Sequence, residues 1–185
     1  MMLIKPILLK HLTTTLIGPH GITDIIHANN TNLIPEMTQT YGSVIGSTVV
    51  LSQMNMTPFI DILFFIGSVI HFRRDMPEIK RIPRFMLSSL LLSFTIIHCP
   101  DLFMLYMLAI HVPHHYSMNW DYMKKTPKFS VILLIVTSTL MGIIGNSFEP
   151  NEHMDLIIAI TKGIILSHIA YEEMYIFENN MIKID

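Results

Sequence analysis

Long apolar runs separated by short polar connections are the dominant pattern of this sequence. The run Phe129 to Phe148 contains no charged residue, and at about 1.5 Å per residue it is long enough to cross a hydrocarbon core about 30 Å thick. Other apolar runs are weaker, and several of them meet at proline or glycine. Together the runs predict an all-α fold, a polytopic membrane helix bundle of about six to seven transmembrane helices. The weaker runs are Met2 to Ile17, Tyr41 to Met56, Thr57 to Phe72, Phe85 to His98, Asp101 to Met118 and Leu156 to Phe177.

The composition supports a protein in contact with a lipid bilayer. Of the 185 residues 51% are hydrophobic and only 14% are charged, and the mean hydropathy is +0.49. In soluble domains about a quarter of all residues are usually charged. We therefore expect residues 1–185 to form a single integral membrane domain. A phosphate-binding loop and a basic face are both lacking, so no nucleic-acid partner is expected, and the single Cys99 excludes an internal disulfide.

Basic residues gather in two of the predicted connections, which are separated by two predicted spans. Both clusters therefore lie on the same side, and the positive-inside rule makes that side cytoplasmic. Several histidines end spans that run toward this side, so a site built from them is expected near the cytoplasmic face. The clusters are Arg73, Arg74, Lys80, Arg81 and Arg84, and Lys124, Lys125 and Lys128.

Histidines recur near the ends of apolar runs, with an acid or a second histidine four residues later. In a helix this spacing places the two side chains one turn apart on the same face. Metal ligands, or a ligand with the carboxylate that supports it, are often presented in this way. The pairs are His20 with Asp24, His71 with Asp75, His168 with Glu172, and His111 with His115.

These histidines predict a metal site inside the bundle. Inserting a charged side chain at the centre of a membrane helix costs roughly 2.5 to 3.5 kcal/mol, and such residues usually have a function. Several histidines at the same membrane depth therefore suggest that they serve one function together. Neutral imidazole binds Fe, Zn or Cu. Four nitrogen ligands without a thiolate favour Fe(II) with open positions for oxygen, and Zn remains an alternative. A single histidine in an apolar helix is more often a hydrogen-bond donor, so the prediction depends on the whole set.

Four segments resemble, in order and in sequence, the signature stretches of the Brp/Blh family of membrane carotenoid dioxygenases. The apolar stretch Phe85 to His115, which Pro100 interrupts, is similar to the corresponding part of that family. The four segments are Gly18 to Asp24 (GPHGITD), Val69 to Phe72 (VIHF), Ile110 to Tyr116 (IHVPHHY) and Ser167 to Met174 (SHIAYEEM).

The resemblance implies an oxidoreductase of retinal biosynthesis, which cleaves the central double bond of β-carotene with O2 to give two retinal molecules. It implies a non-haem Fe(II) cofactor, an apolar carotenoid substrate, and a retinal-binding membrane protein as an acceptor of the product. Asp24 matches the family pattern in place and offset, and the last family acid aligns better with Glu173 than with Glu172. The implied catalytic iron ligands are His20, His71, His111 and His115, and the implied supporting residues are Asp24, His168, Glu173, Asp75 and Glu172.

Two other functional classes remain open from the sequence. Arg73 replaces a family glycine and Arg74 follows it, so two cations lie within one turn of His71 and disfavour a second positive centre there. A non-catalytic or divergent multi-pass membrane protein of the same fold is therefore one alternative. The other is a membrane di-iron desaturase or hydroxylase acting on acyl chains, because His111-x-x-His114-His115 matches one histidine box of those enzymes.

Overall fold

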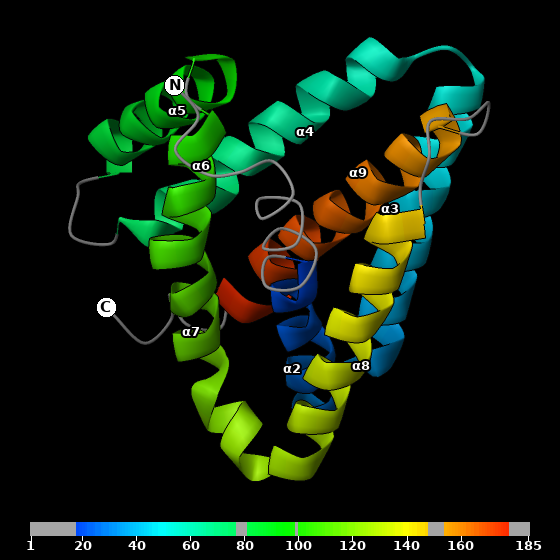
Figure 1. Cartoon of the computed structure of the whole chain (residues 1–185), viewed down its shortest axis with the longest axis vertical. Coiled ribbons are helices and arrows are strands. Elements are labelled where there is room, and N and C mark those ends of the chain that lie inside the picture. The colour runs from blue at the N-terminus through cyan, green and yellow to red at the C-terminus, as the bar shows by residue number, and fades with distance from the viewer. Residues whose placement is uncertain (1–17, 77–80, 99, 148–153, 178–185) are drawn as a thin grey trace.

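The computed structural model describes residues 18–76, 81–98, 100–147 and 154–177, and every regular element in these ranges is a helix (Figure 1). The prediction of an all-α fold is confirmed. The described elements are η2 (Gly18–Ile22), α2 (Thr23–Thr31), α3 (Ile34–Gln53), α4 (Thr57–Phe72), η3 (Arg73–Asp75), α5 (Arg81–His98), α6 (Pro100–Tyr106), η4 (Met107–His111), α7 (Val112–Lys125), α8 (Pro127–Ser147), α9 (Met154–Tyr171) and η5 (Glu172–Phe177).

Proline and asparagine set the helix boundaries around the first half of the chain. Pro35 and Pro58 lie in the first turns of α3 and α4, where a missing backbone N–H costs nothing and the fixed φ suits a helix. Asn32, which follows α2, has a φ of 60°, and Asn55, which follows α3, has a φ of 58°. Asparagine tolerates this left-handed conformation, so both helices end there and the chain turns back.

The apolar runs of the sequence correspond to helices of the structure. The run Thr57 to Phe72 has the same bounds as α4, and the run Leu156 to Phe177 is contained in α9 and η5. The run Asp101 to Met118 is divided among α6, η4 and α7. The short polar helix α2 was not among the predicted spans, and the run Met2 to Ile17 lies outside the described residues.

The prediction of an integral multi-pass membrane protein is wrong. Within the described part of the chain, no helix combines the length and the apolar character that are needed to cross a membrane. Helix α4, for example, has 16 residues, or about 24 Å at 1.5 Å per residue, which is shorter than a hydrocarbon core of about 30 Å. The strongest predicted span ends at Phe148, which lies outside the described residues. The six to seven spans and the placement of the site at a cytoplasmic face are withdrawn with this prediction.

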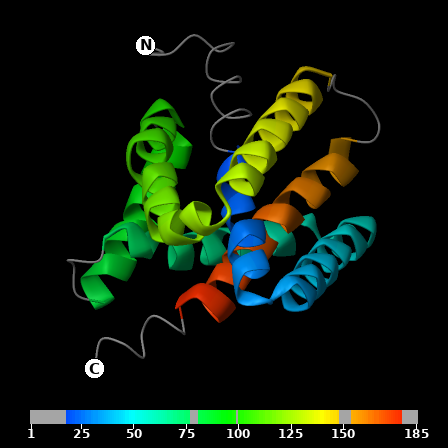
Figure 2. The ribbon, with the colours of Figure 1, turned by 90° about the horizontal axis from the view of Figure 1, so that it is seen from below.

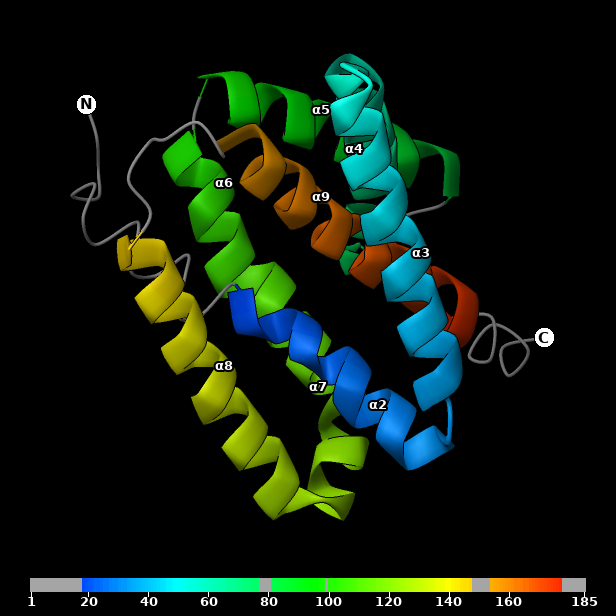
Figure 3. The same cartoon turned by 90° about the vertical axis from the view of Figure 1, so that its right-hand side faces the viewer.

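Helix α9 packs against both α3 and α4, and α2 packs against α7 (Figures 1 and 3). The turn η2 contacts α8, which lies beside α2 in the view from below (Figure 2). A buried cluster of Val69, Phe72, Leu92, Tyr106 and Met107 joins α4, α5, α6 and η4. These contacts bring η2, the end of α4, the start of α7 and the end of α9 to one place.

A glycine on α9 allows α3 to approach closely, and we expect Gly163→Ala to destabilise the fold. A Cβ atom at Gly163 would lie 2.4 Å from Thr48 Oγ1 and 3.0 Å from the backbone of Ile45, so the helices would have to move apart. Overpacking of this kind costs about 1–3 kcal/mol, against a gain of up to about 1 kcal/mol from the helix propensity of alanine.

Chemical denaturation of the two proteins measures this difference, and Gly46→Ala on α3 is the matched control. A Cβ atom at Gly46 would meet nothing within 4 Å, so this variant should be at least as stable as the parent. Equal stabilities of Gly163→Ala and Gly46→Ala would show that the close approach of α3 and α9 is absent.

Candidate metal centre

Five histidines from four separate segments form one cluster. His20 lies on η2, His71 near the end of α4, His111 and His115 at the junction of η4 and α7, and His168 on α9. Neighbouring ring centroids are 4.4 to 5.3 Å apart. All of these side chains are buried except that of His20, which is half-buried. Each of the five histidines singled out by the sequence therefore contributes to the cluster.

The backbone around His111 and His115 departs from a regular α-helix. Pro113 lies in the first turn of α7 and cannot donate a helical hydrogen bond to the preceding turn. The chain immediately before α7, η4, is a π-helical turn, a widened form that is frequent at functional sites. Despite this irregularity the two imidazole centroids are only 4.4 Å apart.

Two aspartates orient two of the imidazoles through their Nδ1 atoms. His111 Nδ1 donates to Asp75 Oδ2 over 2.8 Å, and His168 Nδ1 donates to Asp24 Oδ2 over 2.9 Å. Both aspartates also accept a tyrosine hydroxyl: Tyr41 donates to Asp24 over 2.7 Å, and Tyr106 donates to Asp75. A carboxylate on the outer nitrogen of a histidine fixes its tautomer and leaves Nε2 as the ligand atom.

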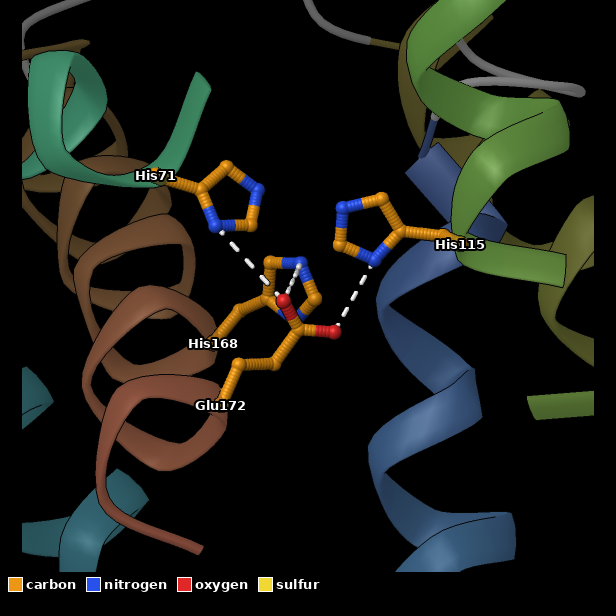
Figure 4. Close-up of side chains that lie close together, drawn as sticks. All are labelled: His71, His115, His168 and Glu172. Atoms are coloured by element: carbon orange, nitrogen blue, oxygen red, sulfur yellow. Dashed lines mark ion pairs between the residues drawn. The ribbon is translucent and has the colours of Figure 1, made fainter. Parts of the chain in front are cut away.

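Glu172 occupies the space between three histidines, as Figure 4 shows. Its Oε1 atom lies 2.9 Å from His115 Nδ1, and its Oε2 atom lies 3.6 Å from His71 Nδ1 and 3.9 Å from His168 Nε2. The side chain is completely buried. Burial raises the pKa of Glu172, while the charges of His168 and Arg74 oppose this increase. One carboxylate thus faces the Nδ1 atoms of both His71 and His115.

The inner nitrogens of His71 and His111 lie where a shared proton or a cation can sit between them. His71 Nε2 lies 3.3 Å from His111 Nε2, while the Nδ1 atom of each ring faces a carboxylate. When both rings are neutral with their protons on Nδ1, two lone pairs face each other. Two nitrogens bound to one metal at about 2.1 Å and a tetrahedral angle are about 3.4 Å apart. The observed separation fits two ligands of one ion.

The protonation of the rings also suits a metal. Burial lowers the pKa of His71 and of His115 well below the ordinary value, with neighbouring histidines adding to the effect. These two rings are therefore neutral at pH 7 and offer lone pairs. Burial also lowers the pKa of His168, but the charges of Asp24 and Glu172 outweigh it and raise the pKa to about 9. A metal ion would have to displace that proton.

Two groups of donors could hold a metal ion, and they share His115. One group is His71, His115, His168 and Glu172, and the other is His20, His111 and His115. Glu172 approaches the Nδ1 atoms of His71 and His115, the side of the rings that the other carboxylates use for support. We therefore interpret Glu172 as a supporting carboxylate, and the Nε2 atoms as the ligands.

No known protein family, no curated protein and no solved structure matches this chain. Membership of the Brp/Blh family therefore stays a prediction. The centre has to be interpreted from its own residues, by the donor atoms that it brings together and by the groups that hold them.

The acids differ from the sequence prediction in the histidines that they contact. Asp24 contacts His168, which is distant in the chain, and Asp75 contacts His111. Glu173, which aligned better with the family acid than Glu172, forms ion pairs with Arg73 and Arg74 instead. The carboxylate that meets the histidines in the last segment is Glu172.

Several other groups lie around the centre, and the two tyrosines among them were not identified from the sequence. Tyr41 and Tyr106 bind the two aspartates, yet they lie 17 and 31 residues away from them in the chain. His27, seven residues after His20, is buried outside the cluster, and its Nδ1 atom lies 2.9 Å from the Tyr171 hydroxyl. His114 is half-buried, and its ring contacts His115 with centroids 6.5 Å apart.

Proposed function

We propose that this chain binds one Fe(II) ion at the histidine cluster and is an oxygenase that cleaves a carotenoid, with β-carotene as substrate and retinal as product. The observation that carries the proposal is the convergence of five imidazoles, four of which have a ring nitrogen facing a buried carboxylate. Imidazole is a suitable ligand for iron, and the described cluster holds no thiolate that would favour other metals. When bound, Fe(II) would supply the activation of O2.

The protein's own residues would hold the ion in a fixed geometry. Donor atoms of His71, His115 and His168 lie together with Glu172, and those of His20 and His111 lie together with His115. His168 Nε2 makes no hydrogen bond to any described residue. Asp24 and the other carboxylates would keep each ring in one tautomer and orientation. The order of the histidine segments, which resembles the Brp/Blh family, supports the same assignment.

The surroundings of the cluster suit an apolar substrate. Phe72 packs with its ring centroid 4.6 Å from that of His111, and Val69 and Met107 belong to the same buried apolar cluster. A polyene hydrocarbon has no polar group for a charged side chain to bind, so shape and apolar contact have to select it. These side chains would also keep water away from the metal.

Expression in a carotene-producing cell tests the proposal directly. We expect the parent to bleach the cells and to produce retinal, detected by chromatography, and we expect His111→Ala and His115→Ala to leave the carotene intact. His114→Ala is the matched control, because His114 is adjacent but lies outside the described ligand groups, and it should retain activity.

Three outcomes separate the alternatives. Intact carotene in a well-expressed, iron-loaded parent would contradict carotenoid cleavage and favour a non-catalytic metal protein. Equal bleaching by the parent and both variants would contradict the site. The metal content separates the chemistry further: one iron per chain supports the mononuclear centre, and two would support a di-iron enzyme.

A further inference from the structure

Arg74 lies next to Glu172 at the histidine cluster although it is itself a cation. It lies on η3, directly after the helix that carries His71. Its side chain is 10% exposed, with Nη1 3.7 Å from Glu172 Oε2 and with Nη2 in an ion pair with Glu173 Oε1. The guanidinium therefore spans two consecutive carboxylates at the start of η5. The sequence alone suggested that this arginine would oppose a metal.

The contact with Arg74 is one of four that surround the Glu172 carboxylate. Neither of its oxygens accepts a hydrogen bond from a described side chain with suitable geometry, and the groups around it are His115, His71, His168 and Arg74. An arginine is a planar fork of donors that matches carboxylate geometry. Among these neighbours, only Arg74 also forms an ion pair with Glu173, the residue that follows Glu172.

We propose that Arg74 is a positioning residue of the metal centre, which holds the Glu172 carboxylate against the Nδ1 atoms of His115 and His71 and thereby increases the affinity for a divalent cation. The inference rests on the proposed metal centre and is independent of the cleavage reaction. Residues that orient metal ligands from the second shell typically change metal affinity about 10- to 100-fold when they are mutated.

The direction in which the metal affinity changes on mutation of Arg74 distinguishes a positioning role from a purely electrostatic one. Removing a positive charge near a dication should strengthen metal binding if charge alone matters. Loss of the support that Glu172 gives to the histidines should weaken metal binding. Arg73 provides the matched comparison, because it is the neighbouring residue with the same charge, and among the described residues its ion pair is with Glu173, over 3.8 Å.

The test measures Co(II) binding to the full chain by competition with a chromophoric chelator, together with the visible absorption of the bound Co(II). We expect Arg74→Gln to weaken Co(II) binding about 10- to 100-fold and to change the Co(II) spectrum. Arg74→Lys should recover part of the affinity, because it keeps the charge without the fork. Arg73→Gln should bind Co(II) as tightly as the parent or more tightly, with an unchanged spectrum.

Binding by a folded Arg74→Gln protein that equals or exceeds that of the parent would overturn the inference. If Arg74→Gln does not fold, Arg74→Lys decides, and a parent-like affinity and spectrum of that variant would overturn it equally. A parent that binds no Co(II) would overturn the inference and the metal centre together. A parent that binds Co(II) normally but, when loaded with iron, leaves carotene intact would overturn only the proposed reaction.

Discussion

Replacing His111 by alanine is expected to weaken Fe(II) binding by about 100- to 1000-fold. Metal-binding free energies of about 10–16 kcal/mol shared among four ligands give roughly 2.5–4 kcal/mol for each ligand, and about 1.4 kcal/mol corresponds to a factor of ten. The effect should be among the largest at this centre. The Nε2 atom of His111 lies 3.3 Å from that of His71, and its Nδ1 atom donates to Asp75.

Anaerobic competition between the protein and a coloured Fe(II) chelator measures this change. His114→Ala is the control, because it removes the same side chain three residues further along the chain at a half-buried position outside the described ligand groups. It should bind Fe(II) within a factor of about three of the parent, a free-energy difference well below the 1.4 kcal/mol of a tenfold change. If His111→Ala keeps parent-like affinity, the ion does not bind at the Nε2 face of the cluster.

The helices of this protein were predictable because residues close to each helix end determine where the helix begins and stops. The apolar run Thr57 to Phe72 has Pro58 in its first turn and coincides with α4. The short helix α2 was not predicted, because its nine residues include Asp24, His27 and two asparagines and show little apolar character. Helix α2 is held by α7 and α3, and such tertiary support does not appear in a local pattern.

The histidines of the centre were predictable, but the carboxylate partners were not. A spacing of four residues identified histidines that the fold brings together, because a helix places side chains at this spacing on one face. The partner of each acid depends on how distant segments cross. Asp24 contacts His168, which is 144 residues away, and Asp75 contacts His111, which is 36 residues away.

The membrane prediction failed for a different physical reason. Composition measures how apolar the chain is, but it does not say where helices break. The run Asp101 to Met118 is divided by η4, and α4 stops after 16 residues. Arg74 likewise was judged by its charge alone. Its ion pairs with Glu172 and Glu173 depend on η5 lying beside η3, which the sequence does not show.

Removing the metal is expected to destabilise the protein by about 4 kcal/mol, when compared with a metal concentration of 1,000 times the dissociation constant. For a chain of this length, about 2–4 °C per kcal/mol converts this into a decrease of the unfolding temperature of about 8–16 °C. The cause is structural, because the candidate ligands come from four segments and buried carboxylates face ring nitrogens of several of them. Without a cation these groups lose the charge that draws them together.

Thermal unfolding with added Fe(II) or with a chelator, both under anaerobic conditions, measures this difference. The raised pKa of His168, about 9, means that its proton competes with the metal below that pH, so the metal-dependent increase should be larger at alkaline than at acidic pH. His111→Ala should show little metal-dependent change, because one of its ligands is gone, while His114→Ala should behave as the parent does. Identical unfolding temperatures of the parent with metal and with chelator would mean that the packing of α3, α4, α7 and α9 alone holds the five imidazoles together, and that the cluster binds no metal.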